Sequence, residues 1–138
     1  MRLERFVSAQ RRDFSRALQE IENGRKLTHW MWYIFPQLQG LGHSDMAQFY
    51  GIEDLEEAKA YLAHPELSKN LETACQALLE LDTDDAVAVF GHTDAMKLRS
   101  CMTLFAIADE DISLYGAVLE KFFDGRYDRA TLNILGMQ

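Results

Sequence analysis

The polar side chains that could do chemistry in this sequence stand at the two edges of its most apolar stretch, residues 28–44. Arg25, Lys26 and His29 form the first edge, where a histidine at a helix entrance can exchange a proton or anchor a ligand. Flat tryptophan rings follow at once and could stack on a base or a sugar. The alternative interpretation is that the rings fill the core and that His29 only bonds a backbone carbonyl group.

The second edge is a glycine-containing loop that runs from Gln37 to Ser44, directly after Pro36. Gly40 and Gly42 permit backbone conformations that other residues avoid, and they expose N–H groups. If Ser44 opens the next helix, these N–H groups could form a seat for an anion. The loop lacks the lysine and the spacing of a P-loop. The alternative interpretation is a plain connecting loop.

A third candidate place lies in residues 91–103, where Lys97 and Ser100 flank the apolar face of a predicted helix. A lysine beside a hydroxyl group can hold a phosphate or a carboxylate. The alternative is an ordinary helix with one solvated side. Together the three places give the candidate ligand-binding set Arg25, Lys26, His29, Gln37, Gly40, Gly42, Ser44, Lys97 and Ser100.

Motifs for metal binding or covalent catalysis are absent from the sequence. The four histidines show no close ligand spacing such as HExxH. There is no G-x-S-x-G motif, and Cys75 and Cys101 fall on apolar faces of predicted helices, where thiols are usually inert. The sequence therefore predicts no metal and no cofactor. It names no catalytic residue and leaves open whether the protein is an enzyme.

The composition narrows the classes of partner. The chain has 138 residues, the length of one domain, and its 22 acidic and 14 basic residues give a net charge of −8. An acidic domain repels a phosphate backbone, so a nucleic-acid polymer is not an expected partner, whereas a single small anion is compatible with it. No signal peptide and no membrane-spanning run of about 20 apolar residues are visible. We expect a cytoplasmic protein with both thiols free.

The spacing of apolar residues predicts an all-α domain, residues 1–138, of several short helices around a buried, tryptophan-rich central helix. Strands are not expected, because β-branched residues are few and never alternate. In the first helix, Gln10 lies within the apolar stripe and needs a buried partner. The predicted helices are about 3–23, 29–35 with Thr28 as its cap, 46–50, 55–62 after Asp54, 65–81, 86–90 after Thr83 or Asp84, 93–108, 114–123, and a last one capped by Asp128.

Four motifs spread over nearly the whole chain resemble those of a known family. They are RFVSAQ at 5–10, HWMWYIFPQLQGLGHS at 29–44, AYLAHPEL at 60–67 and VFGHTDAMKLRSCMTLFA at 89–106. They are similar to the bacterial domain-of-unknown-function family 1810, whose members are sometimes mislabelled calpastatin. The resemblance implies a compact, mostly helical single domain. It implies no established activity, so no catalytic residue is transferred.

Two functional hypotheses follow. The first is a small helical domain that binds a small anionic or nucleotide-like ligand at the three candidate places. The second is a protein-interaction or structural module without a small-molecule site, which acts through its helical surface and acidic charge. If His29, Gln37, Ser44 and Lys97 line one concave site, the first hypothesis gains. If they are scattered, or are all held in backbone hydrogen bonds, the second is favoured. The sequence leaves the ligand and the oligomeric state open.

Overall fold

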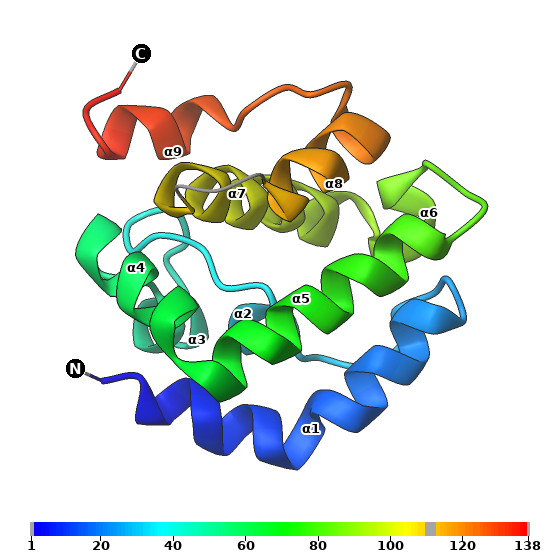
Figure 1. The fold of residues 1–138 in the computed structure, drawn as a ribbon, viewed down its shortest axis with the longest axis horizontal. Helices are drawn as coiled ribbons and strands as arrows, with labels where there is room; N and C mark the ends of the chain where they lie inside the picture. The colour runs from blue at the N-terminus through cyan, green and yellow to red at the C-terminus, as the bar shows by residue number, and fades with distance from the viewer. Residues whose placement is uncertain (1, 110–112, 138) are drawn as a thin grey trace.

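The computed structural model describes residues 2–109 and 113–137 of the protein, and in those ranges it contains nine helices and no strand (Figure 1). The prediction of an all-α fold is therefore confirmed. The helices are α1 (Glu4–Glu22), α2 (Met31–Ile34), α3 (Asp45–Tyr50), α4 (Leu55–Ala63), α5 (Pro65–Glu80), α6 (Ala86–Phe90), α7 (His92–Ala108), α8 (Leu114–Phe123) and α9 (Arg129–Ile134).

Three of the nine helix starts in the described residues are capped by the side chains that the sequence indicated. Ser44, Asp54 and Asp128 each accept a hydrogen bond from the backbone N–H group three residues further on. The cap of α6 is different from the prediction. Asp85 accepts from the Ala88 N–H group, whereas neither predicted residue, Thr83 or Asp84, caps that helix. These local bonds explain why so many short helices begin at defined residues.

The helix predicted to start at His29 is only one turn long, α2 (Met31–Ile34). The prediction of Thr28 as its cap is wrong, because the Thr28 hydroxyl and N–H groups donate to Glu20 of α1, at 2.6 and 3.0 Å. These bonds hold the entrance to α2 away from helical geometry, and Trp30 precedes the helix with φ −144°. A contact between distant residues thus shortens a helix that local periodicity favoured.

The tryptophan-rich segment at residues 30–35 is buried, as the sequence predicted, with one exception. In Figure 1, α2 lies in the middle of the molecule behind α5, and it contacts both α1 and α3. The fully buried Trp30 ring meets the Phe90 ring edge-on at 6.3 Å, and the Phe35 ring meets the Phe90 ring edge-on at 6.1 Å. Trp32 is the exception, because its side chain remains partly exposed.

Gln10 has the buried partners that its place in the apolar stripe requires. Its Nε2 atom donates to the Tyr33 carbonyl oxygen at 2.8 Å and to the Tyr61 hydroxyl at 2.9 Å. Its Oε1 atom accepts from Asn70 Nδ2 at 2.9 Å. The amide therefore ties α1 to α2, α4 and α5, which supports a structural role.

Helix α7 is the central helix of the second half of the molecule. It packs against α4, α6, α8 and α9, and its residues 101–105 are all buried. In Figure 1, α8 and α9 cover α7 on the side away from α1. The side chains of α7 consequently position both the predicted lysine edge and the C-terminal helix.

Candidate functional site

The structure brings two of the predicted cations together. Lys26 Nζ lies 2.9 Å from one carboxylate oxygen of Asp94, and Lys97 Nζ lies 3.5 Å from the other. Each ammonium group also lies over an indole ring, Lys26 at 5.3 Å from Trp30 and Lys97 at 5.2 Å from Trp32. Since one carboxylate faces both lysines, much of their positive charge is already compensated.

Lys97 shares a cavity with Gln37, another predicted residue. Both line a small cavity beside Trp32, together with Met31, Phe35, Ala47, Tyr50 and Gly51. The cavity holds only about 10 Å³. That volume has room for roughly one water molecule. The predicted residues converge here, but the space between them does not admit a ligand.

The glycine loop is closed against α3. Ser44 caps that helix, with its Oγ atom 3.1 Å from the Ala47 nitrogen, so one N–H group of the predicted anion seat is already bonded. A Cβ atom at Gly42 would lie 2.7 Å from the Ala47 Cβ atom, so this glycine permits a close approach. Gly40 has φ +98°, a conformation that favours glycine. The contacts of this loop are those of a packed connection.

The remaining predicted residues do not join this cavity. Arg25 and His29 are exposed and are not among the residues that line it. Ser100 is buried, and its hydroxyl group donates to the Met96 carbonyl oxygen one turn back, at 3.1 Å. The nine predicted residues therefore do not form one concave site, although Gln37 and Lys97 lie together.

A buried carboxylate that sequence reasoning missed organises the start of the central stretch. Besides the two bonds from Thr28, Glu20 accepts from the Leu27 N–H group at 2.7 Å and from Trp30 Nε1 at 2.8 Å. Burial alone would raise the pKa of Glu20, but these hydrogen bonds outweigh it and lower the pKa to about 2. With its oxygens occupied, Glu20 is ionised and structural. The sequence held one signal for this role, because Glu20 lies three residues after Ala17 and so falls on the apolar stripe of the first helix.

A second polar cluster ties Tyr33 to α1. The Tyr33 hydroxyl donates to Asp13, whose carboxylate also pairs with Arg12 at 3.1 Å and Arg16 at 3.3 Å. Burial works to raise the pKa of Asp13, but the bond from Tyr33 and the two arginines lower it overall. Burial and the bond to Asp13 raise the pKa of Tyr33. The phenol is therefore protonated and committed to Asp13, which makes this cluster part of the scaffold.

A groove of about 540 Å³ lies between α7 and the C-terminal segment. We call it the arginine groove. It is lined by Arg99, Arg126, Tyr127, Arg129, Leu132, Asn133 and Met137. Its volume lies within the usual range of small-molecule pockets, roughly 300–1,000 Å³. Three arginines thus line one concavity of a chain whose net charge is −8.

Helix α7 fixes the wall of this groove. Arg99 donates from Nε to the Arg126 carbonyl oxygen at 3.0 Å and from Nη2 to the Tyr127 carbonyl oxygen at 2.7 Å. One turn further, Thr103 Oγ1 accepts from the Asp128 N–H group at 2.8 Å. Asp128 then caps α9. The loop between α8 and α9 is therefore held by side chains of a buried helix.

The other two arginines of the groove are uncommitted. Neither Arg126 nor Arg129 has a side-chain hydrogen bond or ion pair to any residue that the structure describes. Tyr127 stands between them in sequence and is 48% exposed. The segment GRYDR, residues 125–129, was the available signal, because two arginines flank an aromatic residue. Sequence reasoning passed over it because no periodicity placed it near Arg99.

The two thiol groups lie in the core of the protein. Both cysteines are free and fully buried, and burial raises the pKa of the Cys75 and Cys101 thiols. Residues 2–109 and 113–137 contain no group of three or more histidine, cysteine, aspartate or glutamate side chains that could hold a metal ion. In the same ranges no helix combines the length and the apolar character that a membrane crossing requires.

Comparisons with known proteins agree with this picture of a helical domain without an assigned activity. No curated protein matches the chain. The crystal structure of the conserved hypothetical protein Rv1873 from Mycobacterium tuberculosis is 41% identical, with 99% of this chain and 97% of that chain covered and a TM-score of 0.95. A model of the family described as "Protein of unknown function (DUF1810)" matches residues 1–135. The chain therefore belongs to that family of uncharacterised proteins, DUF1810.

Proposed function

We propose that this protein binds a small anionic ligand of the phosphate-bearing, nucleotide-like class, and that the arginine groove is its principal site. The observation that carries the proposal is the pair of uncommitted guanidinium groups, Arg126 and Arg129, beside Arg99. A guanidinium group presents several N–H donors in a plane and pairs with phosphate oxygens two at a time. In an acidic chain such a local group favours one small anion over a polymer.

The other lining residues suit the remainder of a nucleotide. The half-exposed Tyr127 ring offers a face on which a base can stack. Asn133 supplies an amide with both donors and an acceptor, and Leu132 and Met137 supply apolar walls. Because the groove is held by Arg99 and Thr103, little ordering is needed when a ligand binds.

The lysine edge predicted from the sequence is a weaker place for the same ligand. Gln37 and Lys97 share a cavity there, but its 10 Å³ would have to open before any ligand entered. Asp94 lies 3.5 Å from the Lys97 ammonium group and would oppose an anion. We therefore assign the ligand to the arginine groove and treat Lys97 as the comparison.

A thermal-shift panel tests this assignment. Inorganic phosphate, pyrophosphate, AMP, ATP and ADP-ribose are each added in excess to the wild-type chain. A ligand at about 100 times its dissociation constant adds roughly 2.7 kcal/mol of stability and raises the melting temperature by several degrees. Arg129→Gln and Arg126→Gln should lose most of this increase. His29→Ala and Lys97→Gln should keep it.

The matched control is Arg11→Gln, because Arg11 is an exposed arginine whose guanidinium pairs with Glu66, and it does not line the groove. It should respond to the ligands as the wild type does. The proposal fails if no member of the panel stabilises the protein. It also fails if Lys97→Gln abolishes the stabilisation and Arg129→Gln leaves it intact.

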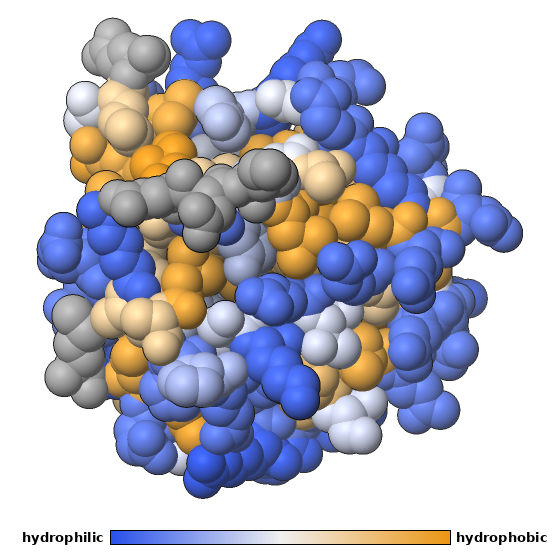
Figure 2. Space-filling view, viewed as in Figure 1, coloured by the Kyte–Doolittle hydropathy of each residue, from blue (hydrophilic) through white to orange (hydrophobic). Residues whose placement is uncertain are grey.

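The second hypothesis, a partner-binding module, is favoured by two observations. Of the predicted residues His29, Gln37, Ser44 and Lys97, only Gln37 and Lys97 line one cavity. The other observation is an exposed apolar surface. Tyr127, Ile134 and Met137 are large apolar side chains that are 43–49% exposed near α9. In Figure 2, hydrophobic atoms gather over α9 at the upper left. Sedimentation velocity across a hundredfold range of concentration would reveal self-association through this face. A concentration-dependent dimer that Ile134→Ser abolishes would favour the interaction module over a small-ligand site.

A further inference from the structure

We infer that the ligand of the arginine groove is a nucleoside diphosphate, and that the groove selects its terminal diphosphate over a single phosphate group. The inference rests on the proposed function, because it concerns the same site. Its basis is the balance of charge in the groove. Among the residues that the structure describes, three arginines and no carboxylate line it. A ligand with three negative charges therefore leaves no cation of the lining uncompensated.

Arg99 is the fixed cation of the three. Its Nε and Nη2 atoms each donate one hydrogen bond to a carbonyl oxygen, that of Arg126 at 3.0 Å and that of Tyr127 at 2.7 Å. A guanidinium group has five N–H donors, so the remaining donors can reach a ligand. The two carbonyl groups carry no net charge. Arg99 consequently holds a full positive charge against the backbone of the loop that bears the other two arginines.

Arg126 and Arg129 are the free cations. Both are exposed, and neither side chain has a hydrogen bond or an ion pair within the described residues. Each guanidinium group can bind two oxygens of a phosphate group through parallel N–H bonds. Two adjustable guanidinium groups beside a fixed one suit a pair of linked phosphates better than one isolated phosphate.

Two carboxylates lie near the groove, and in the described part of the chain neither pairs with its arginines. Asp128 is directed to its own helix, where its Oδ2 atom accepts from the Thr131 N–H group at 3.0 Å and from the Thr131 hydroxyl at 2.6 Å. The Glu120 carboxylate lies against Gly125. Neither acidic residue lines the groove. The positive charges of the three arginines are therefore available to a ligand.

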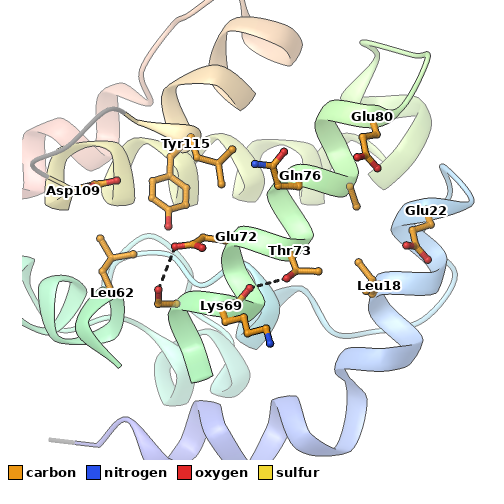
Figure 3. A pocket seen from close by; sticks show the side chains of 13 residues that line it. Leu18, Glu22, Leu62, Lys69, Glu72, Thr73, Gln76, Glu80, Asp109 and Tyr115 are labelled. Carbon is orange, nitrogen blue, oxygen red and sulfur yellow. Dashed lines mark hydrogen bonds between the residues drawn. The ribbon is translucent and has the colours of Figure 1, made fainter. Parts of the chain in front are cut away.

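The larger groove of the molecule does not compete for this ligand. It runs along α5, has a volume of about 900 Å³ and is shown in Figure 3. Its lining includes the carboxylates of Glu22, Glu72, Glu80 and Asp109 and one cation, Lys69. Figure 3 shows Glu22 and Glu80 towards one end and Glu72 near the middle. Such a surface repels an anion with several charges, so the arginine groove is the better place despite its smaller volume.

Three nucleotides separate the effect of charge from that of the diphosphate itself. A terminal phosphate group carries about two negative charges near neutral pH, so AMP leaves one arginine uncompensated. The inner phosphate of ADP adds one further negative charge and completes the balance. In ADP-ribose both phosphates are esterified, so the same diphosphate carries about one negative charge fewer than in ADP. The inference therefore ranks ADP above both AMP and ADP-ribose.

Isothermal titration at low ionic strength tests this ranking, since salt screens exposed ion pairs. Wild type should bind ADP about tenfold more tightly than AMP or ADP-ribose, because one more charge-assisted hydrogen bond forms. Arg129→Gln removes one free cation and should abolish most of the preference for ADP over AMP. Arg129→Lys keeps the charge and should retain most of it. Both variants should melt like the wild type without ligand, because the Arg129 side chain has no partner in the described residues.

The matched control is Arg11→Gln, which removes an exposed arginine outside the groove and should keep the wild-type preference. The inference is overturned, with the proposed function intact, if AMP or ADP-ribose binds the wild type as tightly as ADP. It is also overturned if Arg129→Gln keeps the full preference, or if Arg129→Lys loses as much of it as Arg129→Gln. If none of the three nucleotides binds at millimolar concentration, the proposed nucleotide site fails together with the inference.

Discussion

At the scale of single residues, Glu20 explains why the tryptophan-rich stretch starts where it does. One buried carboxylate accepts from the backbone of Leu27 and Thr28, the Thr28 hydroxyl and the Trp30 indole. A buried charge is tolerated only when such donors surround it. The chain between α1 and α2 is therefore folded around an ionised carboxylate, and its conformation depends on the glutamate at residue 20.

We predict that Glu20→Gln lowers the free energy of unfolding at pH 7 by about 2 kcal/mol, because hydrogen bonds to a charged group are replaced and an amide NH₂ faces donors. The pKa of Glu20 in the folded protein is lowered to about 2 from its ordinary 4.5. The stability it adds is therefore present above about pH 4.5 and is lost as the pH falls towards 2.

Urea unfolding of both proteins between pH 2 and 7 measures this effect. The difference in free energy should shrink steadily between pH 4.5 and pH 2. The control Asp82→Asn changes an exposed carboxylate in a turn and should differ little from the wild type. A Glu20→Gln effect that stays constant over the whole range would show that the carboxylate is not held ionised by these donors.

At the scale of elements, α7 determines the geometry of the arginine groove through two side chains one turn apart, Arg99 and Thr103. Thr103 is fully buried, and its Oγ1 atom accepts from the Asp128 N–H group and donates to the Arg99 carbonyl oxygen. Ser100 makes only the second kind of bond, to Met96. A hydroxyl group that returns to its own helix adds little stability. The two hydroxyls therefore provide a matched comparison.

Thr103→Val should lower the free energy of unfolding by about 1–3 kcal/mol, because the Asp128 N–H group loses its acceptor. It should also weaken ligand binding in the arginine groove, since Tyr127 and Arg129 flank that residue. Ser100→Ala should change stability by less than about 0.5 kcal/mol. Thermal unfolding of the two variants measures both losses of stability. Equal losses would mean that the contact to the loop contributes nothing beyond a bond within the helix.

Most of the helices were predictable because they depend on their own local sequence, whereas α2 and the arginine groove depend on distant residues. Apolar spacing and a local cap define α5 and α8 without reference to the rest of the chain. The shortened α2 depends on Glu20, and the arginine groove depends on Arg99 bonding residues 27 and 28 positions away. The sequence named Gln37 and Lys97 as two of nine candidate residues, but it could not show that Asp94 compensates the lysine or that packing leaves a cavity of about 10 Å³.

At the scale of the whole molecule, charge separates small ligands from polymers. A net charge of −8 opposes any long polyanion, whereas the arginine groove presents cations only over a short distance. We predict no detectable binding of a 20-base-pair DNA duplex at 150 mM salt by fluorescence anisotropy. Arg11→Gln is the control, and its anisotropy with DNA should equal that of the wild type. Micromolar or tighter DNA binding that Arg126→Gln and Arg129→Gln abolish would contradict this prediction.

The most direct test of the proposed function is a crystal structure of the protein with the panel ligand that stabilises it most. We predict phosphate oxygens within hydrogen-bond distance of the Arg126 and Arg129 guanidinium groups, and a base or sugar against Tyr127. Arg99 should keep its bonds to the two carbonyl groups of the loop. A ligand seated beside Trp32 and Lys97 instead, or an arginine groove that stays empty at saturating ligand, would contradict the account.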